Sequence, residues 1–134
     1  MLIWDETMST GDARTDFQHK TLIEKFNDLS EIIDPKKTGP AGNPQTAGDI
    51  LDFLEFYAAW HFRQEEKLMQ ELNCPVADLN KHDHAEFLAN FAAFKTRWHD
   101  SNQDPAIARA AHAELEHWIT DHILQVDIKL RDSF

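Results

Sequence analysis

Apolar side chains recur at spacings of three and four residues through four segments of this chain, and no other feature limits its fold as strongly. Such spacing gathers the apolar residues on one side of an α-helix. The first segment shows it in the run Leu22, Phe26, Leu29 and Ile33. Amphipathic helices bury their apolar sides against one another, so we expect the four to share one core. The predicted helices cover residues 14–34, 46–72, 78–100 and 105–130.

Helix-breaking residues separate the four segments. Thr46 has a side chain suited to the N-cap of the second helix, and Asp104 followed by Pro105 has the residue types expected at the start of the fourth. Helices of this length joined by short connections favour antiparallel neighbours. The sequence therefore predicts an all-α, antiparallel up-down-up-down four-helix bundle. The predicted breaks lie at Asp34-Pro35, within 38–44, at 73–75 and at 101–104.

The first twelve residues show no helical period and contain Gly11. We expect residues 1–12 to form an N-terminal arm that covers part of the bundle with Leu2, Ile3 and Trp4. The length of 134 residues lies within the usual range for one domain. We therefore expect residues 1–134 to form a single domain.

Charge and hydropathy exclude several classes of partner. The formal net charge of -11 argues against nucleic acid, which is bound through basic patches, and against anionic membranes. No run approaches the roughly 20 consecutive apolar residues of a membrane span, and the opening residues lack the pattern of a signal peptide. We expect a cytoplasmic protein. Cys74 is the only cysteine, so a metal site would have to use nitrogen and oxygen donors.

Polar residues interrupt the apolar stripes. His61 and Glu65 lie four residues apart on the stripe of the second helix, which puts their side chains about 40° apart on one face. An unpaired buried carboxylate would be strongly destabilising, and a bound cation removes that cost. Imidazole and carboxylate donors suit iron, manganese and zinc alike. Further polar residues on or beside the other stripes are His19, Asn80, His84 and His122.

Taken in order, these residues resemble those of the hemerythrins, particularly the bacterial single-domain members, over nearly the whole chain. The resemblance implies a pair of non-haem iron ions, joined by an oxo or hydroxo bridge, inside the four-helix bundle. The residues that carry it are Trp4 with Asp16-Phe-Gln-His19, His61-Phe-Arg-Gln-Glu65 followed by Met69, Pro75 with His84 and Phe87, and Trp118-Ile-Thr-Asp-His122 followed by Asp127.

The resemblance also implies a role for each ligand. Glu65 and Asp127 would bridge the two iron ions. One ion would be held by His19 and His61, and the other by His84 and His122. The assignment of Asp127 depends on the resemblance alone, because five residues after His122 correspond to 140° of regular helix.

Asn80 departs from the family pattern, which has a histidine at this position. Its side chain could offer the carbonyl oxygen as a weaker ligand, hydrogen-bond a water molecule that fills the position, or leave the iron with an open position. His82 lies 200° from Asn80 around a regular helix, so we expect it in solvent.

Three other histidines are expected on the surface: His99, His112 and His117. A ferritin-like di-iron site would need two Glu-x-x-His motifs on separate helices. Here only Glu114 to His117 fits, which disfavours that alternative.

The resemblance places the bound ligand, dioxygen or another small diatomic molecule, at the iron held by His19 and His61. An apolar lining would exclude water and protons and would slow the release of superoxide or peroxide. The residues that the resemblance places around the ligand are Leu22, Phe62, Trp118, Ile119 and Ile123, all apolar in this sequence.

Three classes of function follow. The leading hypothesis is a dioxygen-binding protein without enzymatic activity that stores, delivers or senses oxygen. Because of Asn80, a di-iron oxidase or peroxidase-like enzyme is the first alternative. A metal-poor interaction or structural domain is the second. Covalent attachment to a signalling domain in a longer parent chain stays open.

Overall fold

The computed structural model describes residues 2–34 and 44–134. Its α-helices in these ranges are α1 (Ala13–Ile33), α3 (Pro44–Glu71), α4 (Ala77–Asp100) and α5 (Pro105–Gln125), and two 3-10 helices, η1 (Glu6–Met8) and η2 (Asp127–Ser133), flank them. Most of the connection predicted at Asp34-Pro35 and within 38–44 lies outside the described residues, which leave out 35–43. No helix in the described part of the chain is both long and apolar enough to cross a membrane.

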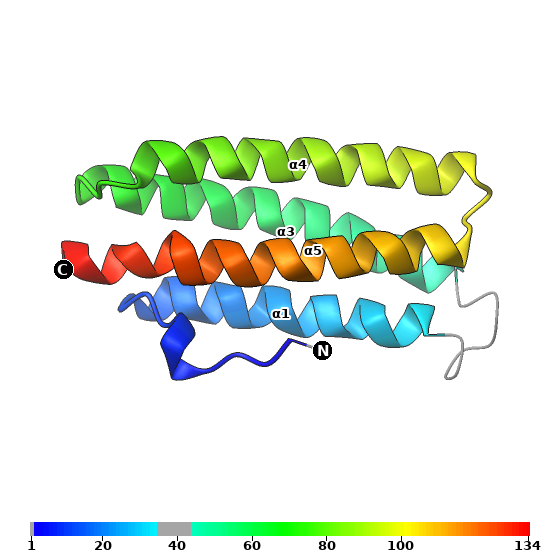
Figure 1. Cartoon of the computed structure of the whole chain (residues 1–134), viewed down its shortest axis with the longest axis horizontal. Helices are drawn as coiled ribbons and strands as arrows, with labels where there is room; N and C mark the ends of the chain where they lie inside the picture. The colour runs from blue at the N-terminus through cyan, green and yellow to red at the C-terminus, as the bar shows by residue number, and fades with distance from the viewer. Residues whose placement is uncertain (1, 35–43) are drawn as a thin grey trace.

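The four α-helices form an antiparallel bundle. α1 packs against α3 and α5, and α4 packs against the same two helices on the other side. Successive helices run in opposite directions, so the connection from α3 to α4 and the C-terminus of α5 lie at the same end of the bundle, on the left in Figure 1. The predicted all-α up-down-up-down fold is confirmed.

The helix starts agree with the sequence prediction in one case and differ in another. Asp104 caps α5 by accepting a hydrogen bond from the backbone N–H of Ala106, with Pro105 at the first helical position, as predicted. The second helix begins at Pro44 instead of being capped by Thr46. Proline fits the first turn of a helix because an N–H there has no partner within the helix.

The fourth helix ends earlier than predicted. α5 stops at Gln125, and residues Asp127–Ser133 form the 3-10 helix η2, whereas one α-helix to about residue 130 was expected. Val126, between them, has φ -116° and ψ -61°, and its N–H donates to the carbonyl of His122 at 2.9 Å. A 3-10 helix has three residues per turn, so the regular α-helical rotation no longer applies beyond Val126.

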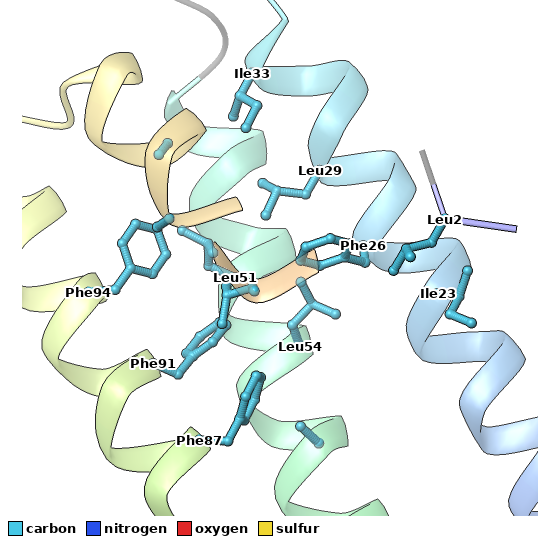
Figure 2. Packing of buried hydrophobic residues seen from close by; sticks show 14 of the residues in the cluster. Leu2, Ile23, Phe26, Leu29, Ile33, Leu51, Leu54, Phe87, Phe91 and Phe94 are labelled. Carbon is cyan, nitrogen blue, oxygen red and sulfur yellow. The ribbon is translucent and has the colours of Figure 1, made fainter. Parts of the chain in front are cut away.

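The apolar stripes of α1, α3 and α4 meet in the core. Figure 2 shows Phe26, Leu29, Leu51, Leu54 and Phe91 directed toward one another from these three helices. All of them are at most 5 % exposed. Buried groups of this kind provide most of the free energy of folding of such a bundle, at about 25 cal/mol for each Å² removed from water.

The N-terminal arm docks on α1 through Leu2. The N–H of Leu2 donates to the Asn27 side chain at 3.1 Å, and Asn27 Nδ2 donates back to the carbonyl of Leu2 at 2.7 Å. Leu2 is buried and Trp4 is partly buried against the core, as expected. Ile3 is 76 % exposed, so the expectation that it covers the bundle is wrong. Successive residues of an extended segment point in opposite directions, which turns Ile3 toward solvent.

His112 is buried, although a surface position was expected. Its ring stacks on Phe26 with the centroids 4.1 Å apart, and its Nε2 donates to the backbone carbonyl of Phe26 at 3.2 Å. His112 lies four residues after Ala108 and three before Leu115, both buried. It therefore belongs to a buried stripe of α5 that contains alanines, and the hydrophobic pattern of this stripe is weak in the sequence.

Replacing His112 by Gln should reduce the acid sensitivity of the fold. Burial lowers the pKa of His112 below 6.5, and the hydrogen bond to Phe26 offsets this only in part. Because the folded-state pKa is the lower one, the stabilisation is present above the unfolded-state value and is lost as the pH falls through the folded-state value. Urea unfolding of ion-free protein between about pH 7.5 and about pH 5 should show a smaller loss of stability in the variant. The exposed His99→Gln change is the control, and equal pH dependence in all three proteins would contradict this role of His112.

Candidate metal centre

The six predicted metal ligands lie together. They belong to the helix ends that meet where α3 connects to α4, an end of the bundle that Figure 1 shows on the left. α1 contributes a ligand from its first half, α3 two from its last turns, α4 one from its first turns, and α5 and η2 one each where they meet. Each ligand is at most 6 % exposed. The residues are His19, His61, Glu65, His84, His122 and Asp127.

The Glu65 carboxylate divides its two oxygens between two pairs of side chains. Oε2 lies 3.1 Å from His19 Nε2 and 3.3 Å from His61 Nε2. Oε1 lies 3.2 Å from His84 Nε2 and accepts a hydrogen bond from Asn80 Nδ2 at 2.8 Å. Each oxygen therefore faces a different histidine group, as a carboxylate that bridges two cations must.

Asp127 divides its oxygens in the same way. Oδ2 lies 3.2 Å from His19 Nε2, and Oδ1 lies 3.0 Å from His122 Nε2. The change from α5 to η2 at Val126 brings this carboxylate back to His122, which a regular helix would not do. Two groups of converging ligand atoms result, one of His19, His61 and Glu65 and the other of Glu65, His84, His122 and Asp127.

The convergent atoms cannot all satisfy one another by hydrogen bonding. His84 Nε2 and His122 Nε2 face each other at 3.2 Å, and Asn80 Oδ1 lies 2.7 Å from the same nitrogen of His122. Asp127 Oδ1 is one of the few buried side-chain oxygens or nitrogens in residues 2–34 and 44–134 without a hydrogen bond. A cation in each group would accept these lone pairs, so the residues fit a pair of ions with imidazole and carboxylate donors.

The charges of the centre also favour cations. Burial acts to raise the pKa of Glu65, but the facing His61 and the hydrogen bonds from His19 and the other histidines hold it well below 4.5. Burial acts to lower the pKa of His19, but hydrogen bonds to Asp127 and Glu65 raise it to about 10. Without an ion, the carboxylates thus keep a proton on His19, and a cation that binds there would displace that proton.

Three of the four histidines have an oxygen acceptor facing the ring nitrogen that points away from the centre, and for His61 and His84 this contact is a hydrogen bond. His61 Nδ1 lies 2.6 Å from Gln18 Oε1, His84 Nδ1 3.1 Å from Glu66 Oε2, and His122 Nδ1 3.4 Å from Asp83 Oδ2. An oxygen that accepts from Nδ1–H leaves the lone pair of Nε2 directed at the site. The residues that support the histidine ligands in this way are Gln18, Glu66 and Asp83.

These supporting residues were not predicted from the sequence. Each one follows or precedes a predicted ligand in the sequence, which was the available signal. All three, however, support a ligand of a different helix. Gln18 of α1 contacts His61 of α3, Glu66 of α3 contacts His84 of α4, and Asp83 of α4 contacts His122 of α5. Such pairings depend on how the helices pack.

Removing the Gln18 amide should weaken the ion at His19 and His61. Gln18→Ala would free the His61 ring to rotate, and the loss of such a support typically lowers metal affinity about 10- to 100-fold. Gln18→Glu keeps an oxygen acceptor and should restore most of the affinity. Gln64→Ala, in the same surface depression, is the control. Competition with a chelator measures the change, and unchanged affinity in Gln18→Ala would show that the support is dispensable.

An apolar cavity of about 40 Å³ adjoins the centre. It touches His19, His61, His122 and Asp127, and its size is close to the roughly 30 Å³ that one water molecule occupies in the liquid. All five predicted pocket residues line it: Leu22, Phe62, Trp118, Ile119 and Ile123. The remaining lining residues, which were not predicted, are Phe26, Leu54, Ala58, Phe87, Phe91 and Leu115.

Two of the aromatic lining residues also hold ligands in place. Phe62 stacks on the His84 ring with centroids 3.8 Å apart, and Trp118 stacks on His122 at 4.5 Å. His82, by contrast, is 74 % exposed at its side chain and pairs with Glu86, so it points to solvent as expected.

Comparison with known proteins agrees with this geometry. The family model described as Hemerythrin HHE cation binding domain matches residues 10–130. The bacteriohemerythrin of Stenotrophomonas maltophilia (strain R551-3) is 26% identical over 123 residues, which are 92% of this chain and 74% of the relative. That of Clostridium acetobutylicum is 26% identical over 127 residues, 95% of this chain and 96% of the relative. A crystal structure of wild-type hemerythrin has the same fold, with a TM-score of 0.76 and 24% identity over 96% of this chain and 93% of that one. Since the family model spans most of the sequence, the chain belongs to the hemerythrin family.

Proposed function

We propose that this chain binds two non-haem iron ions and, at them, dioxygen or another small diatomic molecule. The observation that carries the proposal is the division of two buried carboxylates between two histidine groups, directly beside an apolar cavity. Membership of the hemerythrin family supports iron as the metal. When bound, the iron pair supplies the reversible electron transfer that holds dioxygen.

The residues of this chain would share the two ions as follows. His19 and His61 would hold the first ion, together with Oε2 of Glu65 and Oδ2 of Asp127. His84 and His122 would hold the second, together with Oε1 of Glu65 and Oδ1 of Asp127. Two carboxylates contribute a charge of about -2 to a pair of divalent ions, so part of the positive charge is left for an anionic ligand or bridge.

The cavity would select for a small apolar ligand and keep it dry. Its volume of about 40 Å³ is enough for a diatomic molecule. Apart from the metal ligands, the walls are apolar and offer water no hydrogen bonds, and exclusion of water limits the proton transfer that promotes release of the ligand as superoxide or peroxide. We propose storage, delivery or sensing of oxygen in the cytoplasm as the role, where reducing conditions suit a chain with a single cysteine.

A polar group in the cavity should shorten the lifetime of the oxygenated protein. Ile119→Asn would introduce a hydrogen-bonding side chain beside the ligand and draw water in, and we expect autoxidation to be about 10-fold faster or more. Ile119→Val keeps the wall apolar and should change the rate much less. The decay of the visible absorption band in air measures this. Equal rates in the two variants would mean that the cavity does not shield the ligand.

The proposal is tested by loading the protein with iron anaerobically and then cycling it between air and vacuum. We expect a visible absorption band that appears in air and disappears under vacuum over several cycles. Loss of the band without recovery, accompanied by consumption of oxygen, would favour the oxidase or peroxidase-like alternative. Failure to retain iron would contradict the proposal and favour an interaction or structural domain.

A further inference from the structure

Asn80 lies among the metal ligands, in the first turn of α4, and its side chain has no contact with solvent. Its Nδ2 donates to Glu65 Oε1 at 2.8 Å and lies 3.2 Å from Met69 Sδ. Its Oδ1 lies 2.7 Å from His122 Nε2. Both polar atoms of the amide are therefore directed into the centre.

The chemistry of the neighbours fixes which way this amide points. An ionised carboxylate only accepts hydrogen bonds, and a thioether sulfur is a weak acceptor, so the NH₂ group must face Glu65 and Met69. The reverse orientation would set Oδ1 against a buried carboxylate oxygen. Oδ1 is left facing the space between His84 Nε2 and His122 Nε2, which are 3.2 Å apart.

That space is where an ion held by His84 and His122 would lie, because Glu65 Oε1 and Asp127 Oδ1 also border it. A water molecule in place of the Asn80 oxygen, or an open position, would require the amide to turn away from the centre. The contacts of Nδ2 with Glu65 and Met69 hold it in place instead.

Building on the proposed di-iron function, we propose that Asn80 determines a difference between the two ion positions. Its Oδ1 is a neutral oxygen ligand of the ion at His84 and His122, and its Nδ2 fixes the orientation of the shared carboxylate of Glu65. The first position then has two imidazole and two carboxylate donors. The second has two imidazole and two carboxylate donors as well, and an amide oxygen in addition.

The consequence is a second position that is richer in hard oxygen donors than a three-histidine site. An amide oxygen is a weaker donor than imidazole for a first-row ion such as Fe²⁺, and oxygen donors shift preference toward Mn²⁺. We expect the chain to bind its two ions in separate steps, and the step at His84 and His122 to be weaker than it would be with a histidine at position 80.

Anaerobic calorimetric titration of ion-free protein with Fe²⁺ tests this directly. The wild-type chain should show two binding steps. Asn80→His should strengthen the step at His84 and His122 about 10-fold or more, and Asn80→Ala should weaken that step about 10- to 100-fold. The step at His19 and His61 should change much less in both variants. Asn90→Ala, on the exposed side of the same helix, is the matched control.

The Gln18→Ala variant gives the complementary measurement, because it should weaken the step at His19 and His61 while the Asn80 variants move the other one. Circular dichroism checks that each variant is folded. Asn80→Ala removes the amide donor from a buried oxygen of Glu65, so the gain of affinity in Asn80→His tests the inference even if the alanine variant unfolds.

Two results would overturn the inference. If the wild-type chain binds two ions and neither step responds to Asn80→His, Asn80 is not a ligand, although the di-iron function would stand. If the wild-type chain binds fewer than two ions, the proposed function fails and the role of Asn80 fails with it.

Discussion

Replacing Glu65 by Ala is expected to abolish tight binding of both ions at once. Oε1 and Oε2 face different histidine groups, so the single substitution removes a charged ligand from each. Breaking a buried charge pair by removing one partner costs roughly 3–5 kcal/mol. This corresponds to a loss of about 100-fold to more than 1000-fold in affinity for each ion. Iron content after gel filtration measures the effect.

The variant Glu65→Gln separates the loss of charge from the loss of shape. Glutamine keeps one carbonyl oxygen for one ion but presents an NH₂ group to the other, so we expect at most one ion to be retained. Glu86→Gln, an exposed change on α4, is the control and should bind two ions. Retention of two ions by Glu65→Gln would show that the carboxylate does not bridge them.

Removal of the ions should lower the melting temperature by about 20 °C or more. An ion at 1000 times its dissociation constant stabilises the folded state by about 4 kcal/mol, so two independent ions would contribute roughly 8 kcal/mol. For domains of comparable size, each kcal/mol shifts the melting temperature by about 2–8 °C. The six buried ligands and the buried Asn80 converge at the centre, where Asp127 Oδ1 has no hydrogen bond without an ion.

Calorimetric melting of chelated, reloaded and wild-type samples measures this shift. Reloading with Fe²⁺ under anaerobic conditions should restore the original melting temperature. The chelator should have no effect on Glu65→Ala, which has no ions to lose. A shift of less than a few degrees on chelation would indicate that the ions contribute little to the fold.

The fold and most of the metal ligands could be predicted because both depend on helical spacing. The polar residues His61, Glu65, Asn80 and His84 occupy positions on the apolar stripes, and all four are buried in the structure. A polar residue at a core position of a helix needs a hydrogen-bond partner or a bound ion there, and the family resemblance indicated that the partner is an iron ion. The cavity residues followed from the same resemblance.

Other features of the structure could not be predicted from the spacing of residues along a regular helix. Asp127 comes close to His122 only because the helix changes its winding at Val126. His112 was placed on the surface because the stripe on which it lies consists largely of alanine. The direction of the Asn80 amide is set by Glu65 and Met69, which belong to another helix.

The most direct test of a dinuclear centre is diffraction from crystals of the iron-loaded protein, with data collected on either side of the iron absorption edge. We expect two anomalous peaks about 3.5 Å apart, the separation usual for two-metal sites. One should contact Nε2 of His19 and His61, and the other Nε2 of His84 and His122 together with Oδ1 of Asn80. A single peak, or peaks that Glu65 and Asp127 do not join, would contradict a carboxylate-bridged pair of iron ions.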